Sequence, residues 1–221
     1  MLYNPLDGRV VDRARAEIAA YSEEEIARLV AALERGEPGP GQWQIRAILG
    51  IASSGRRITS ILSLTPADHD FEAGTVVWRA EFAKGTAYGR GDVVMPMTPL
   101  HRAAVLWALE HHPNPNGPEA PLIYRTRNPA EPMRQSAADR QLKRLEERAG
   151  VQRAPGRAFH GFCRAAITLV SDLFGDEVAS EFTGRKPETI RRYSYKKIVP
   201  KTMQKVAAGM ERWGKEQEGG E

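Results

Sequence analysis

The stretch Gly55-Arg-Arg-Ile-Thr-Ser-Ile-Leu-Ser-Leu64 places two adjacent arginines directly before a short apolar run. Ser53 and Ser54 precede this stretch, Gly55 opens it, and Thr65-Pro66 follows it. Because these residue types commonly interrupt helices, they predict a short helix that ends at Leu62. Ile58, Ile61 and Leu62 recur at helical spacing and are expected to face a core. We therefore expect both arginines in the first turn of a short, partly buried helix.

Outward from this stretch, helical periodicity dominates and one pair of strands interrupts it. The β-branched runs Thr75–Glu81 and Gly91–Met95 flank a glycine-rich spacer and predict a hairpin. Ser22 and Glu25 have the spacing of a capping box. The other expected helices are Glu23–Glu34, Trp43–Ala52, Pro99–His111, Ser136–Ala149, Phe159–Phe174, Asp176–Phe182, Pro187–Tyr195 and Pro200–Trp213, with Val11–Ala20 partly helical. The sequence thus predicts a mainly α fold with a small antiparallel β-sheet (α+β).

The composition is that of a globular chain, with 221 residues and a net charge of +4. Cys163 is its one cysteine, which excludes an internal disulfide, and no metal-ligand spacing is present. No apolar run is long enough to span a bilayer, and the N-terminus is too charged for a signal peptide. A cytoplasmic location is the expectation.

Positive charge is concentrated between residues 184 and 205, where Glu188 is the one acidic residue. The basic residues of this segment are Arg185, Lys186, Arg191, Arg192, Lys196, Lys197, Lys201 and Lys205. Such a segment suits a polyphosphate partner, because each neutralised phosphate releases condensed counterions. By charge alone, a solvated face is an equal alternative.

Four segments, in this order along the chain, resemble the signature boxes of the tyrosine recombinases, the phage integrase family. In the opening stretch, Arg57 takes the position of an arginine on the family's short helix. Lys84 lies between the two strands, and Val93-Val-Met-Pro96 resembles the family's strand end "vVPL". Phe159-His160-Gly-Phe-Cys163-Arg164 resembles "HDLRRTFAT", and Thr183-Gly-Arg185 through Tyr193 resembles "LGHxxxxxTxxxY". Each box alone is weak, and their order makes chance a poor explanation.

The resemblance implies a domain that binds double-stranded DNA and cuts one strand through a 3′-phosphotyrosine, with no cofactor, metal or ATP. Tyr193 would be the nucleophile, and Arg57 would hold the scissile phosphate. Lys84 would protonate the departing 5′-oxygen as general acid. His160 would hydrogen-bond the phosphate or accept the tyrosine proton.

Two positions depart from the family pattern. The family's second arginine falls at Cys163, and Arg164 follows about 100° further round the helix. From this vacancy we expect Cys163→Arg to raise the yield of covalent adduct. Arg185 stands where the family has histidine or tryptophan and can still donate to a phosphate. The segment from Gly184 to Tyr193 is one residue shorter than usual, which leaves Tyr195 as a second nucleophile candidate.

The resemblance also implies partners. Additional DNA contacts are expected from five basic residues: Lys186, Arg191, Arg192, Arg153 and Arg157. We expect a homotetramer on paired DNA sites and no membrane partner. The domain is expected over residues 21–199, after a lead-in at 1–20 that is too short for the family's preceding helical domain, with a helix and polar tail at 200–221. For the apolar stripe of that last helix, packing within the chain and docking on a second copy stay equally open; its residues are Met203, Val206, Ala207 and Met210.

Ordinary structural roles stand beside each of these assignments. A helix-start arginine commonly forms surface ion pairs, a lysine in a glycine-rich turn is commonly solvated, and a tyrosine among basic residues commonly packs. A cysteine hydrolase built on Cys163 and His160 is disfavoured, since no orienting Asn or Asp accompanies them, and a helical cysteine is usually a small core residue. Three hypotheses result: an active recombinase, a recombinase-derived DNA-binding protein without cleavage, and an unrelated helical domain.

Overall fold

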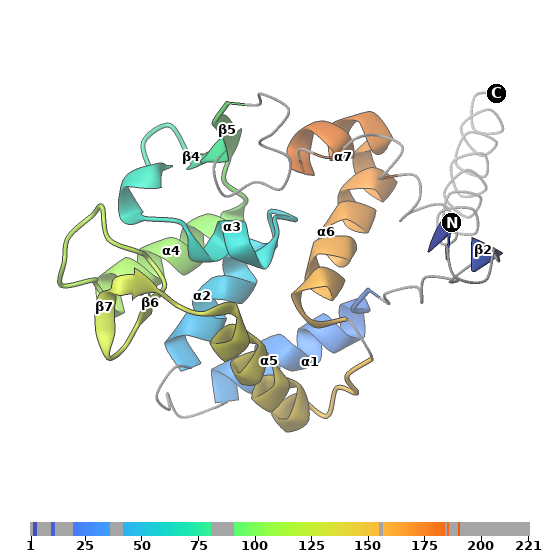
Figure 1. Ribbon diagram of the computed structural model, residues 1–221, viewed down its shortest axis with the longest axis horizontal. Helices are drawn as coiled ribbons and strands as arrows, with labels where there is room; N and C mark the ends of the chain where they lie inside the picture. Colours follow the sequence, from blue (N-terminus) through green and yellow to red (C-terminus); the bar gives the residue numbers. More distant parts are fainter. Residues whose placement is uncertain are drawn as a thin grey trace, which may run out of the picture.

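Helices carry most of the structure, a computed structural model that describes residues 2–3, 10–11, 20–35, 42–80, 91–154, 157–183, 185 and 190 (Figure 1). The helices are α1 (Glu23–Arg35), α2 (Gln42–Ala52), α3 (Ile58–Leu62), α4 (Pro99–His111), α5 (Gln135–Ala149), α6 (Ala158–Phe174) and α7 (Asp176–Thr183), with a 3-10 turn, η1 (Pro66–Asp68). The strands are β1 (Leu2–Tyr3), β2 (Val10–Val11), β3 (His69–Asp70), β4 (Thr75–Trp78), β5 (Val93–Pro96), β6 (Tyr124–Arg125) and β7 (Asn128–Pro132).

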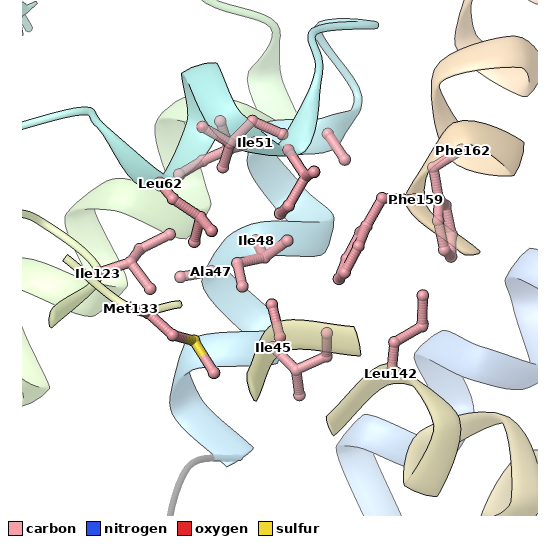
Figure 2. Close-up of a cluster of buried hydrophobic side chains, with 14 of the residues drawn as sticks. Ile45, Ala47, Ile48, Ile51, Leu62, Ile123, Met133, Leu142, Phe159 and Phe162 are labelled. Atoms are coloured by element: carbon pink, nitrogen blue, oxygen red, sulfur yellow. The ribbon is translucent and has the colours of Figure 1, made fainter. Parts of the chain in front are cut away.

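Helix α2 is the centre of the hydrophobic core. Most of its residues are buried, Arg46 being the exposed one, and it contacts α3, α4, α5 and α6. Figure 2 shows Ile45 and Ile48 of α2 between Ile123, which precedes β6, and Phe159 of α6. A helix with so many apolar residues needs such an enclosure, because each of them left exposed would place hydrophobic area in water.

The strands form small antiparallel sheets. β4 lies between β3 and β5, and its register pairs Thr75 with Pro96 and Trp78 with Val93. β6 pairs with β7, and β1 with β2. The fold class expected from the sequence, mainly α with a small antiparallel sheet, is confirmed.

Most predicted helices are confirmed to within one or two residues, and α4 has the predicted bounds. The capping box of α1 is also confirmed. The Ser22 hydroxyl accepts a hydrogen bond from the Glu25 backbone N–H at 3.2 Å, and the Glu25 carboxylate accepts one from the Ser22 N–H at 2.9 Å. These bonds satisfy two N–H groups that a helix start otherwise leaves without partners.

Several expectations need correction. Helix α3 begins at Ile58 rather than Arg56, because the backbone of Arg57 is extended. β4 ends at Trp78 rather than at residue 81, since beyond it the Ala80 N–H donates to the Asp92 carboxylate at 2.8 Å. Val30, which helical spacing predicts on one apolar stripe with Ile26, Leu29 and Leu33, is 44% exposed and lies outside the buried face of α1. Val11, expected in a helix, is in β2, and strands β3, β6 and β7 were not expected at all.

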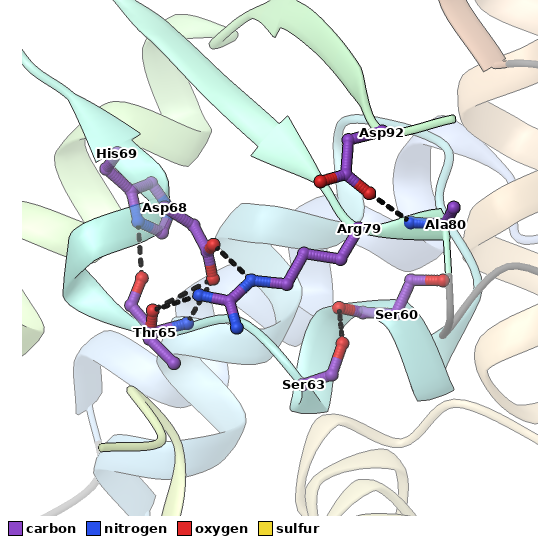
Figure 3. A network of polar contacts seen from close by, with 8 residues as sticks. All are labelled: Ser60, Ser63, Thr65, Asp68, His69, Arg79, Ala80 and Asp92. Carbon is purple, nitrogen blue, oxygen red and sulfur yellow. Dashed lines mark hydrogen bonds and ion pairs between the residues drawn. The ribbon is translucent and has the colours of Figure 1, made fainter. Parts of the chain in front are cut away.

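A polar network ties the end of β4 to η1 (Figure 3). The buried Asp68 carboxylate accepts hydrogen bonds from the backbone N–H and the hydroxyl of Thr65, at 2.7 and 2.9 Å. Arg79, directly after β4, donates from Nε to the other Asp68 oxygen at 2.7 Å. Because Asp68 is only 4% exposed, this pairing supplies the countercharge that a buried carboxylate needs.

Some expected segments lie outside the described residues: the hairpin spacer 84–90, most of the predicted helix 187–195, and all of 200–213. Ile190 is described, and it packs fully buried against Ile167 of α6 and Ala179 of α7. In the described part of the chain, no helix combines the length and apolarity that crossing a membrane requires.

Candidate functional site

A tight turn at Gly55 brings the start of α3 against α6 and α7. Gly55 has a φ of +69°, a conformation that glycine adopts without strain. A Cβ atom there would lie 3.1 Å from the Thr183 side chain and 3.7 Å from Ala166. The glycine thus serves both the turn and the close approach of the helices.

Arg57 follows this turn as the N-cap residue of α3, with φ −71° and ψ 151°. Its side chain is exposed, whereas Ile58 and Ile61 of the following turn are buried. The short helix is therefore fixed by its apolar residues while the guanidinium remains on the surface.

His160, in the first turn of α6, lies in the positive field of this region. Partial desolvation is the main cause that lowers the pKa of His160, and the charges of Arg185 and Arg57 lower that pKa further. Asp139 of α5 opposes the shift, and Arg164, one turn further along α6, adds to it. The charges of Arg57 and Arg185, distant from His160 in sequence, thus act on its ring and disfavour the protonated imidazole.

Cys163 is buried between α6 and the Gly55 turn. Its Sγ lies 2.9 Å from the carbonyl oxygen of Gly55 and 2.9 Å from that of Arg56. Burial raises the pKa of the thiol, although the nearby guanidinium of Arg185 opposes this. A buried, protonated thiol is a hydrogen-bond donor to these carbonyls and a poor nucleophile, which removes the basis for a cysteine hydrolase.

Arg185 reaches the same turn from beyond the end of α7. Its Nη2 lies 3.2 Å from Cys163 Sγ and 3.5 Å from the Gly55 carbonyl oxygen. Its backbone is held by the last turns of α7, where the Arg185 N–H donates to the Ser180 carbonyl at 3.1 Å. Among the charges that act on the pKa values of His160, Arg56 and Cys163, the charge of Arg185 has the largest effect in each case.

Arg56 is a member of the site that the sequence analysis did not assign. Its guanidinium lies 5.2 Å from the centre of the Trp78 ring and contacts the Met95 sulfur. Burial, followed by repulsion from Arg185, lowers its pKa to about 10. Its Nε is buried without a hydrogen-bond partner among the described residues. The available signal was the pair of adjacent arginines, Arg56 and Arg57, at the start of the first box.

Comparison with protein-family models and with curated protein sequences gave no match. Among solved structures, XerA recombinase aligns with a TM-score of 0.63 at 18% identity, over 80% of this chain and 58% of that one. XerH site-specific recombinase, bound to its palindromic difH substrate in a post-cleavage complex, aligns with a TM-score of 0.66 at 17% identity, over 89% and 54%. A lambda integrase dimer bound to a COC′ core site gives 0.62 at 14%, over 82% and 61%.

The chain has the tyrosine recombinase catalytic-domain fold. It spans between one half and two thirds of the length of these neighbours. At such identities the likeness concerns the recombinase fold, and the roles of individual residues have to be argued from this chain.

Two of the arginines expected to contact DNA have internal partners in the recombinase fold. Arg157 is 5% exposed, pairs with Glu25 at 2.9 Å and lies 4.2 Å from the centre of the Tyr21 ring. Arg153 is partly exposed and pairs with the buried Glu146 at 3.4 Å. The assignment of Arg157 to DNA is therefore corrected, because a buried and ion-paired guanidinium is not available to a phosphate.

The remaining expected site residues of the recombinase fold lie outside the described residues. They are Lys84, Lys186, Arg191, Arg192, Tyr193 and Tyr195. Of the expected catalytic set, the described residues are Arg57, His160, Arg164 and Arg185. Arg185 contacts the Gly55 carbonyl, and the charges of Arg185, Arg57 and Arg164 all lower the pKa of His160.

Proposed function

We propose that this chain binds duplex DNA and that Arg57, His160 and Arg185 surround one phosphate of its backbone. The observation that supports the proposal is the contact of Arg185 with the Gly55 turn that leads to Arg57 and with Cys163 of α6, together with the lowering of the His160 pKa by the charges of Arg185 and Arg57. No carboxylate among the described residues pairs with Arg56 or Arg185. A group of cations that repel one another within a fold is stabilised when an anion binds between them.

We further propose that the bound strand is cut and rejoined. The Tyr193 hydroxyl would attack the phosphorus, forming a 3′-phosphotyrosine and breaking the bond to the 5′-oxygen. The neutral imidazole of His160 could accept the tyrosine proton, and Lys84 would give a proton to the 5′-oxygen. The guanidiniums would stabilise the charge that develops on the nonbridging oxygens. Ile190, three residues before Tyr193, packs against α6, the helix that carries His160.

The neighbours support a DNA partner and assembly on it. XerH was solved on its difH substrate and lambda integrase as a tetramer on a Holliday junction. We propose by analogy that this chain acts as a homotetramer on paired sites, in the cytoplasm.

A cleavage assay tests the proposal without knowledge of the target site. The protein is incubated with a pool of nicked duplexes of random sequence, in which release of a short 5′-hydroxyl fragment traps the covalent adduct. We expect an adduct resistant to denaturant that is lost in Tyr193→Phe and kept in Tyr195→Phe. Adduct that persists in Tyr193→Phe would assign the nucleophile elsewhere.

The second candidate is a DNA-binding protein that does not cut. It is favoured by one observation, the buried thiol at the position of α6 where the resemblance expects an arginine. This candidate is selected if the duplex pool is retained in a gel shift while no adduct forms. Equal retention of the duplex and of a neutral polymer would remove both candidates.

A further inference from the structure

The environment of Arg185 differs from that of an ordinary surface arginine. Its described contacts use one nitrogen, Nη2, and both are with groups that carry no full negative charge, the Cys163 thiol and the Gly55 carbonyl. These contacts orient the guanidinium without neutralising it. A guanidinium has five N–H donors, so most of its donors are left for a further acceptor.

The thiol is itself held in place. Cys163 is 4% exposed, and its sulfur is close to two carbonyl oxygens of the turn that leads to Arg57. One side chain therefore contacts the Gly55–Arg56 backbone and Arg185 at the same time. A change at position 163 should alter the position of Arg185 relative to Arg57.

We propose that Cys163 and Arg185 act as one unit, in which the thiol positions Arg185 as the second guanidinium, beside that of Arg57, of a site for a phosphate group. The inference rests on the proposed function and deepens it, because it assigns the phosphate contact to residue 185 and a positioning role to residue 163. Cys163 is then not a defect of the site.

This assignment reverses the expectation for Cys163→Arg. A guanidinium at position 163 would enter a buried space beside Arg185 and Arg56, where it meets two like charges. We expect this single variant to bind phosphate and DNA more weakly than the wild type, not more tightly.

The test uses the full chain, with inorganic phosphate and a random-sequence duplex as probes. The variants are Arg185→Gln and Cys163→Ala, and the control is Arg102→Gln, which removes one charge from an exposed position of α4. Phosphate binding is followed by NMR through the pKa of His160, which a bound anion should raise. Arg185→Gln should raise the His160 pKa of the free protein and reduce the response to phosphate at least tenfold.

Duplex binding gives a second measure. Arg185→Gln should weaken it roughly tenfold and reduce the slope of log K against log salt by about 0.9, the value for one lost phosphate contact. Arg102→Gln should keep the wild-type phosphate response. Cys163→Ala retains the charge of Arg185, so weaker phosphate binding by a folded Cys163→Ala protein supports positioning, whereas a merely structural thiol would change stability alone.

The outcomes separate the two proposals. If Arg185→Gln and Arg102→Gln bind phosphate and DNA equally well, the inference is overturned while DNA binding stands. If the wild type binds phosphate through Arg185 but shows no preference for DNA, the proposed function fails and the inference stands. If Cys163→Ala does not fold, Arg185→Gln alone decides whether the phosphate contact is correct.

Discussion

Two arginines lie at helix α6, Arg157 as its N-cap residue and Arg185 in contact with its Cys163, and their surroundings differ in charge. Arg157 belongs to a carboxylate network formed by Tyr21, Glu25, Glu146, Arg153 and Arg157. In it the Tyr21 hydroxyl donates to Glu146 at 2.5 Å, and both arginines have carboxylate partners. Packing there is tight, since a Cβ at Gly161 would lie 2.6 Å from Arg157 Cγ.

Arg185 belongs instead to a cationic site formed by Arg56, Arg57, His160 and Arg185, in which the arginine charges outnumber the one opposing charge that acts on His160, that of Asp139. The comparison distinguishes an arginine that holds the fold together from one that is arranged for an external anion. The charge of the neighbouring groups decides between these two roles. Removing one member of a buried ion pair strongly destabilises the fold, whereas removing a charge from a like-charged group relieves repulsion.

The largest expected effect is in the carboxylate network. Arg157→Met should lower the free energy of unfolding by about 3 kcal/mol, because it leaves Glu25 unpaired and removes the cation from the Tyr21 ring. Urea unfolding measures this. Arg144→Met, an exposed change on α5, should stay within about 0.5 kcal/mol. Similar losses in both variants would show that the ion pair contributes little.

The next largest effect on stability is expected for His69 and His101, a buried pair of imidazoles. In this pair both partners are neutral rings, whereas the arginines above face charged groups. His69 Nδ1 donates to the Thr65 carbonyl at 2.9 Å, so in the neutral ring its Nε2 accepts from His101 Nε2 at 3.1 Å. Burial lowers the pKa of His101 to about 3 and also lowers that of His69. Since both folded-state pKa values lie below the unfolded value, this stability is present above pH 6.5 and is lost as the pH falls.

We expect a loss of about 2 kcal/mol between pH 6.5 and pH 4.5, measured by urea unfolding across that range. His101→Gln retains a donor for His69 and should flatten the acid limb of the profile. An unchanged slope in this variant would show that other groups cause the acid sensitivity.

The cationic site should respond in the opposite direction from the carboxylate network. Arg56→Met should raise the free energy of unfolding by about 1 kcal/mol, because it removes a buried cation with like-charged neighbours and keeps a flexible side chain against Trp78. Thermal or urea unfolding at pH 7 measures this. A loss of stability as large as that of Arg157→Met would mean that Arg56 has a structural partner and would remove the contrast.

The smallest effect concerns the helix start that supplies Glu25 to the carboxylate network. Ser22→Ala removes the hydroxyl that accepts from the Glu25 N–H, and should lower the free energy of unfolding by about 0.5 kcal/mol. The loss is at the low end for an N-cap because Glu25 keeps its contact with Arg157. Combining Ser22→Ala with Arg157→Met should cost close to the sum, because the Ser22 hydroxyl bonds the Glu25 backbone N–H whereas Arg157 bonds the Glu25 carboxylate, which keeps the Ser22 N–H as a donor. A clear excess over the sum would show that the two contacts are coupled.

Local sequence signals predicted the elements whose ends depend on nearby residues. Thr98 caps α4 and its proline follows, so both bounds of this helix were predicted. Strands β6 and β7 were missed, since Asn128–Pro132 consists of residues that are depleted in strands and pairs with β6 only because the loop is held against α2, where the Gln44 side chain donates to the Tyr124 carbonyl. The exposed position of Val30 likewise depends on how α1 packs on α5, which periodicity does not fix.

By itself, the sequence determined the order of the four boxes and the positions of Arg57, His160 and Arg185 within them, because helix starts, turns and residue spacing are local properties of the chain. Only the tertiary structure decided which arginines face a carboxylate and which face other cations. Arg157 and Arg185 are the same amino acid, and their difference arises from contacts with residues more than 100 positions away, Glu25 for one and Gly55 for the other. Spacing cannot encode such contacts, because they form only when the helices pack.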